Sequence, residues 1–298
     1  MRLLALIATC AGGTAFAETP RVVTDILPVH SLAAAVMEGA GTPTLLLGPG
    51  TDPHHAALKP SQAESLQEAD IVLWMGHGLT PWLEEPIETL AGNADVLELA
   101  DTEGAVTHEM RGDHDDHGHG HGHDHGDTDP HGWLDPVNAR LWLELLADTL
   151  AGADPDNATL YRSNAARAIT DIDAVTAEIR TRLDGAQGAV LVGHDSLQYF
   201  EQRFGLAHAG SLTDASDAAP GSSHIREMRE IAGNRTTACL LTDPETSADL
   251  VATITDGTDL PVIPVDPLGT DLDQGPGLYP ALLRGIGAAY ATCLTSTS

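Results

Sequence analysis

The residues with the clearest capacity for chemistry are histidines gathered near the middle of the chain. Seven of the 15 histidines fall within residues 108–125, where they are interleaved with Gly and Asp. Little in this stretch is apolar, so burial cannot offset the entropy cost of ordering the backbone, and no packed core is expected there. Neutral imidazole is a favoured ligand of Zn²⁺, Cu²⁺ and Ni²⁺. The segment indicates a protein that handles a transition metal. The alternative is an acidic linker whose histidines bind nothing.

Four other positions place a possible metal ligand at or beside a predicted strand end, where α/β proteins gather such side chains. His54 lies in GPGTDPHHAALKPSQ, His131 precedes a helix in DPHGWLDP, His194 lies in VGHDSLQYF, and Asp266 lies in PVDPLGTD. Two of these positions come from each half of the chain, so together they could close one site in a cleft. Three imidazoles and one carboxylate form a four-coordinate set suited to Zn²⁺.

The remaining histidines outside the His-rich segment have no comparable neighbours in the sequence. His55 is ambiguous because it adjoins His54. Asp195 follows His194 and is interpreted either as an acceptor for the second N–H of that imidazole or as the N-cap of the next helix. A structural role is expected for four histidines: His30, His77, His208 and His224.

The elements that must position these ligands follow from short apolar runs that alternate with helical patterns, which predicts βαβ units and parallel sheets. In the first half we expect strands at residues 21–29, 44–47, 70–75 and 96–99, with helices at 30–38, 60–69 and 80–90. In the second half we expect strands at 189–192, 237–242 and 261–265, with helices at 196–204, 247–255 and 278–293.

A different element separates the two halves. Residues 154–183 carry one apolar stripe at spacings of three and four, with Asp154 as N-cap, Pro155 at the first helical position and Gly185 after the end. A single helix of this size would be about 45 Å long. The predicted fold class is therefore α/β, with two lobes that each hold a mainly parallel sheet flanked by helices. One long rigid helix joins them, and the metal site lies in the interlobe cleft.

The predicted organisation has four parts. Residues 1–17 read as an export signal, with a positive start, an apolar stretch and an A-x-A cleavage site before Glu18. A lipoprotein acylated at Cys10 is the alternative. The other parts are an N-terminal lobe that includes a His-rich loop at 108–127, a linking helix and a C-terminal lobe, spanning residues 18–153, 154–185 and 186–298.

Charge and cysteine content narrow the class of protein. The chain has 44 acidic and 14 basic residues, and a net charge of −30 argues against binding nucleic acid or an anionic membrane. Loss of the signal would leave Cys239 and Cys293, an even number in an oxidising compartment. A disulfide is then the default expectation, and it would tie a strand to the C-terminal helix. A metal-binding cysteine pair is the alternative, although neither residue lies in a CxxC motif.

Taken in order, five motifs resemble the cluster A-I metal-binding substrate-binding proteins of ABC transporters, most closely the zinc-specific ZnuA type. The resemblance spans nearly all of the chain after the signal, and its motifs are GTDPHHAALKPSQ, DIVLWMGHGLTPWL, DPHGWLDP, VGHDSLQYF and VDPLGTD. It implies that His54, His131 and His194 bind the metal, with Asp266 or a water in the fourth position. It also implies a disulfide between the two cysteines named above.

The chain departs from this family at one informative place. Several zinc-binding members have an acidic residue immediately before the first ligand, where this chain has Pro53. Manganese-binding and iron-binding members use a carboxylate where this chain has His194. An imidazole at that position favours zinc, because carboxylate-rich sites suit Mn²⁺ better.

The resemblance implies a periplasmic protein, monomeric and without enzymatic activity, that captures Zn²⁺ as transported cargo and delivers it to a membrane ABC permease. Periplasmic metallochaperones are a further class of partner. The loop histidines His114, His117, His119, His121, His123 and His125 would form an auxiliary low-affinity site. Three alternatives stay open at this point: a manganese-binding or iron-binding member of the family, a periplasmic zinc buffer or chaperone without a permease, and a zinc hydrolase. The hydrolase alternative is weakened because this chain has no HExxH motif.

Overall fold

The computed structural model describes residues 19–111 and 128–295. The predicted export signal and the six loop histidines that begin at His114 lie outside the described residues. Within these ranges, no helix combines the length and the apolar composition that a membrane crossing requires.

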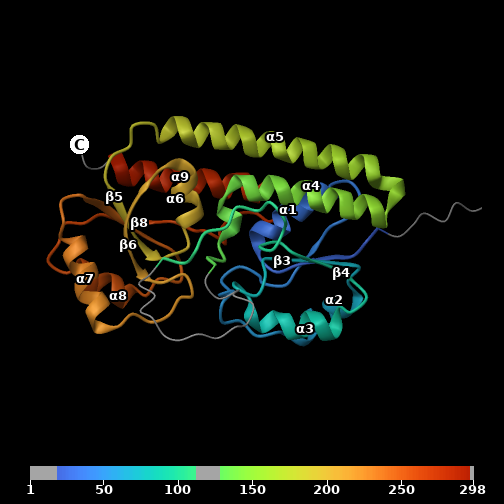
Figure 1. The fold of residues 1–298 in the computed structure, drawn as a ribbon, viewed down its shortest axis with the longest axis horizontal. Coiled ribbons are helices and arrows are strands. Elements are labelled where there is room, and N and C mark those ends of the chain that lie inside the picture. The colour runs from blue at the N-terminus through green and yellow to red at the C-terminus, as the bar shows by residue number, and fades with distance from the viewer. Residues whose placement is uncertain (1–18, 112–127, 296–298) are drawn as a thin grey trace, which may run out of the picture.

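Two sheets of four parallel strands form the centres of two lobes (Figure 1). Their orders, β2-β1-β3-β4 and β6-β5-β7-β8, are equivalent. The first sheet contains β1 (Val22–Thr24), β2 (Thr44–Leu45), β3 (Ile71–Trp74) and β4 (Asp95–Glu98). The second contains β5 (Ala189–His194), β6 (Ala207–Thr213), β7 (Thr237–Thr242) and β8 (Val262–Pro264).

Helices connect successive strands, as a parallel sheet requires. Those of the first lobe are α1 (Leu27–Met37), α2 (Pro60–Glu68), α3 (Glu84–Leu90) and α4 (Pro136–Ala153). Those that follow β5 are α6 (Gln198–Phe204), α7 (Ser222–Ala232), α8 (Ala248–Thr255) and α9 (Leu278–Thr295). Short 3₁₀ turns occupy Pro81–Leu83, Gly132–Leu134 and Pro155–Asn157.

The long linking helix α5 (Ala158–Arg182) runs along both lobes (Figure 1). It packs on α1 and α4 of the first lobe and on α9, which in turn packs on β7 and β8. Gly287 lets α9 approach closely, because a Cβ there would lie 3.0 Å from Ile179 of α5. One continuous apolar core therefore extends from β1 through α5 and α9 to β7. The predicted fold class is confirmed.

Local differences from the sequence-based elements have physical causes. The first strand ends at Thr24 rather than at residue 29, because α1 already begins at Leu27 with Pro28 in its first turn. Asp154 precedes a 3₁₀ turn instead of capping α5, and its carboxylate accepts hydrogen bonds from Asn157 and Tyr161. The sequence did not predict β6 or α7, because β6 consists mostly of half-buried residues and α7 exposes many polar side chains, so neither shows a clear apolar pattern.

The predicted disulfide between Cys239 and Cys293 is present. It joins β7 to the last turns of α9, and both cysteines are fully buried. The opposite end of α9 contacts the first lobe, where the Tyr279 hydroxyl donates to the Trp133 carbonyl at 2.6 Å. Thus α9 as well as α5 connects the lobes, and large separation of the lobes would break one shared core.

Candidate metal centre

Three predicted ligands from separate segments converge between the lobes. His54 lies in the loop that follows β2, His131 immediately precedes the Gly132–Leu134 turn, and His194 is the last residue of β5. Each offers a ring nitrogen, and these nitrogens all lie within 4.8 Å of one another. The ring centroids are 5.0, 5.5 and 5.6 Å apart, so the three imidazoles surround one point.

The Nε2 atoms of His131 and His194 lie 3.1 Å apart. Two nitrogens bound to one tetrahedral zinc at normal bond lengths are about 3.3 Å apart, so this pair already has nearly the spacing that zinc requires. His131 is 2% exposed and His194 7% exposed. Burial prevents water from solvating both nitrogens fully.

The partners of the opposite ring nitrogens set the tautomers. His131 Nδ1 lies 2.8 Å from Asp129 Oδ1, an acceptor, so Nδ1 carries the proton. His194 Nδ1 lies 3.4 Å from the Thr213 hydroxyl, which donates its own proton to Asp217 at 2.9 Å. The hydroxyl therefore accepts from His194. With this assignment, each Nε2 can offer a lone pair to a cation that lies between the two rings.

Burial shifts the pKa values of the side chains at the metal-free site. Burial, with smaller contributions from the two neighbouring imidazoles, lowers the pKa of His54 to about 3. Burial and the proximity of His194 hold the pKa of His131 well below its usual value. Burial raises the pKa of Asp129 to about 7. His54 and His131 are consequently unprotonated at neutral pH, and a metal does not have to displace protons from them.

The fourth predicted ligand, Asp266, follows β8 but is held by its own loop. Its Oδ1 accepts from the backbone N–H groups of Leu268 and Gly269 at 2.9 and 2.8 Å, and its Oδ2 accepts from the N–H and hydroxyl of Thr270 at 2.6 and 2.7 Å. The structure does not place it in the cluster formed by the three imidazoles. Direct coordination by Asp266 therefore stays a prediction.

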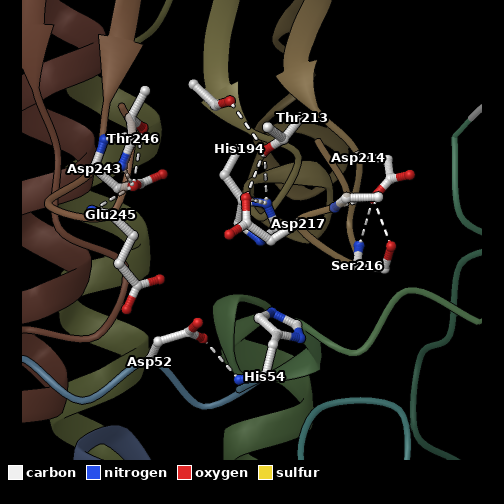
Figure 2. A network of polar contacts seen from close by, with 12 residues as sticks. Asp52, His54, His194, Thr213, Asp214, Ser216, Asp217, Asp243, Glu245 and Thr246 are labelled. Carbon is white, nitrogen blue, oxygen red and sulfur yellow. Dashed lines mark hydrogen bonds and ion pairs between the residues drawn. The ribbon is translucent and has the colours of Figure 1, made fainter. Parts of the chain in front are cut away.

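A ring of carboxylates lies beside the three histidines. Figure 2 shows Asp52 and His54 of the first lobe facing Glu245, Asp217 and His194 of the second. Desolvation and the neighbouring carboxylates, Asp52 foremost, raise the pKa of Glu245 to about 7. His55, which is exposed, pairs with Asp52 at 2.9 Å, and these two residues and Asp217 form a second group with ligand atoms within 4.8 Å. The local charge attracts cations toward the centre.

The other histidines outside the His-rich segment each have a different partner. His30 faces the Pro43 carbonyl, His77 faces Glu84, His208 faces Glu201 and His224 faces the Ser211 carbonyl. Among the described residues none of them joins the cluster.

Sequence reasoning misplaced one residue and missed two. The prediction that the Asp195 carboxylate accepts the second N–H of His194 or caps the following helix is wrong, because this carboxylate instead accepts from Arg111. Asp129 was missed, although its position two residues before His131 was a usable signal. Asp217 carried no such signal, because it comes near His194 only where β6 pairs with β5.

The fold and the site together define a two-lobed metal-binding protein of the kind that acts as the receptor of an uptake system. Residues 22–293 match the family model described as zinc-uptake complex component A, periplasmic. The chain belongs to this family, as the motifs predict. It is therefore the binding component of a zinc-uptake ABC system, a class that works with a membrane permease, and it is not an enzyme.

Individual relatives agree over nearly the whole length. The chain is 40% identical to the high-affinity zinc uptake system protein ZnuA of Paracoccus denitrificans, with 99% of each chain covered. It is 34% identical to the ZnuA protein of Brucella suis biovar 1, with 98% of this chain and 96% of the relative covered. A crystal structure of ZnuA, 21% identical, superposes with a TM-score of 0.78 over 92% of this chain and 99% of that chain, and supports the fold.

The first prediction concerns Asp129, which fixes the tautomer of His131. Asp129→Asn should weaken zinc binding about ten- to a hundredfold, the usual cost of losing the partner of a metal-bound imidazole. Competition titration against a zinc chelator measures the change. Asp148→Asn, at an exposed carboxylate on α4, is the control and should bind zinc like the unchanged protein. An unchanged affinity in Asp129→Asn would show that His131 does not need this acceptor.

The pH dependence of zinc binding gives a second prediction. Three ordinary imidazoles would make the logarithm of the association constant fall by about three per pH unit well below pH 6. His54, with a pKa of about 3, and His131 are already neutral there. Asp129, with a raised pKa of about 7, binds a proton that zinc must expel, so affinity falls as pH falls. Between pH 5 and 6 we expect the logarithm of the association constant to fall by less than about two per pH unit. In Asp129→Asn this slope should be smaller by about one. A slope near three would contradict the lowered values.

Proposed function

We propose that this chain captures Zn²⁺ between its lobes through His54, His131 and His194 and passes it to the permease. The observation that carries this proposal is the pair of Nε2 atoms of His131 and His194, 3.1 Å apart, with the imidazole of His54 completing the triangle. Three imidazole ligands suit zinc and other borderline metals better than manganese. The names of the Paracoccus and Brucella relatives agree with zinc as the cargo.

The fourth coordination position is assigned to Asp266 or to a water that it holds. Each oxygen of its carboxylate accepts two hydrogen bonds from its own loop, so direct metal binding would compete with some of these bonds. A ligand that must break local hydrogen bonds to bind also favours release, because those bonds re-form when the metal leaves. This arrangement suits a protein that must hand over its cargo.

The His-rich loop is proposed as an auxiliary collector. Imidazoles tethered at 114–125 would raise the local zinc concentration at the centre without altering its intrinsic affinity. The proposal also includes export by cleavage after residue 17 and a monomeric state in the periplasm, with metallochaperones as additional partners. Deletion of residues 112–127 should slow zinc capture under scarcity. Unchanged capture would contradict the collector role.

Zinc uptake itself provides the test. Cells that lack this chain should accumulate little radiolabelled zinc from chelator-treated medium, and a copy of the chain should restore accumulation. The purified protein should hold one zinc tightly against a competing chelator, and excess Mn²⁺ should not displace it. Tight zinc binding without restored uptake would support a buffer or chaperone instead of a permease-coupled receptor.

A further inference from the structure

The helix that follows His194 is fastened to the segment that leads to His131. Four side chains of α6 bond with the strap, defined here as residues 106–111 and 128–135, which belong to the first lobe. The Gln198 amide donates to the Glu109 carbonyl, and the Tyr199 hydroxyl accepts from the His108 N–H and donates to the Asp129 carbonyl. The other two α6 side chains form ion pairs.

These ion pairs are reciprocal between the lobes. Arg111 of the strap reaches Glu201 of α6 at 2.7 Å and Asp195, directly after His194, at 3.0 Å. Arg203 of α6 reaches back to Asp135, the N-cap of α4, with Nε to Oδ1 at 2.8 Å. The carboxylates are almost fully buried, so each guanidinium offsets the desolvation cost of the carboxylate with which it pairs.

Of the two arginines, Arg111 contacts the larger number of buried groups. Its Nη1 faces two buried carboxylates and the Nδ1 of His208 at 2.9 Å. Asp195 is 0% exposed, and its Oδ2 has no hydrogen-bond partner within the described residues. Glu201 is further held by the Tyr290 hydroxyl at 2.8 Å. Within the described residues, removal of Arg111 would leave the buried Asp195 carboxylate without an ion pair and Glu201 with only His208 and Tyr290 as partners.

The position of Asp195 connects this cluster to the metal centre. Its backbone N–H donates to the Thr213 carbonyl at 3.2 Å, and the Thr213 hydroxyl faces His194 Nδ1. A shift of Asp195 toward solvent would therefore move both the backbone of His194 and the acceptor of its ring proton. The strap contains His131, so the same contacts set the distance between the two imidazoles.

We propose that Arg111 is a positioning residue that clamps the strap to α6 and holds His194 opposite His131, a role that rests on the proposed zinc site. It does not touch the metal. Its loss should speed zinc release about ten- to a hundredfold, as expected for the loss of a group that orients a ligand.

The test compares Arg111→Gln, Arg111→Lys and Arg284→Gln in the full-length mature chain. Arg284 on α9 forms a half-exposed ion pair with Glu178 of α5 and serves as the control. Zinc release into excess chelator and the visible spectrum of the Co²⁺ form are measured. We expect faster release and an altered Co²⁺ spectrum in Arg111→Gln, substantial recovery in Arg111→Lys, and no change in Arg284→Gln. A folded Arg111→Gln protein with unchanged release and spectrum would overturn the proposal.

Two additions keep the result decisive. If Arg111→Gln does not fold, its combination with Asp195→Asn removes opposite charges together and should still release zinc quickly. Hydrogen exchange in the metal-free protein should be faster in α6 and at residues 106–111 of Arg111→Gln, and unchanged exchange would overturn the clamp. If the unchanged protein binds no zinc tightly, the proposed function fails, and the exchange result alone shows whether Arg111 fastens the lobes.

Discussion

Replacement of any one of His54, His131 and His194 by Ala should abolish tight zinc binding, with a loss of at least about a hundredfold in affinity. The expected loss exceeds that for an outer partner such as Asp129, because an imidazole bound directly to the metal disappears. Competition titration gives the affinity, and the Co²⁺ form should lose its tetrahedral spectrum. His224→Ala, at a half-buried histidine outside the cluster, is the matched control and should bind normally.

The same titration on a protein that lacks residues 112–127 separates the centre from the loop. The deletion should stop at 112, because Glu109 and Arg111 bond with the second lobe. We expect one tight zinc to remain. If tight binding instead followed the deleted histidines and survived all three replacements, the proposed site would be wrong and the chain would be better described as a metal buffer.

Reduction of the Cys239–Cys293 disulfide should lower the free energy of unfolding by about 4 kcal/mol. The bond closes a chain segment with a sequence separation of 54, and a loop of that size restricts the unfolded chain by about this amount. Urea unfolding with and without reductant measures the difference. The double variant Cys239→Ser with Cys293→Ser is the control, because reductant should leave it unchanged.

The location of the disulfide predicts where the reduced protein loosens. Reduction should free the end of α9 from β7, whereas the start of α9 stays attached through Tyr279 to Trp133 and Ser31. Hydrogen exchange should therefore increase first near Cys293. Equal exchange along all of α9 would show that the disulfide is not what holds its end in place.

Much of the site was predictable because its residues have local signals. His194 ends β5, where parallel strands gather ligands, and the sequence around His54 and His131 marks the loop after a strand and the start of a helix. The long helix was predictable from its apolar stripe, of which Ile172, Val175 and Ile179 are buried. In contrast, β6 is an edge strand of mostly half-buried residues, and α7 buries little more than Met228 and Ala232, so neither carried a clear apolar pattern.

The sequence by itself determined the class of protein, the three imidazoles, the cysteine pair and the alternation of strands and helices. Only the tertiary structure decided which carboxylates serve the centre. It placed Asp217 of the second lobe beside Asp52 and His55 of the first, with ligand atoms within 4.8 Å of one another. It also decided that Arg111 would compensate Asp195 and Glu201, which are 84 and 90 residues away. The physical reason is that residue types and local periodicity can be recognised in short stretches of sequence. The partner of a buried charge is instead whichever group the packed chain brings within a few ångströms.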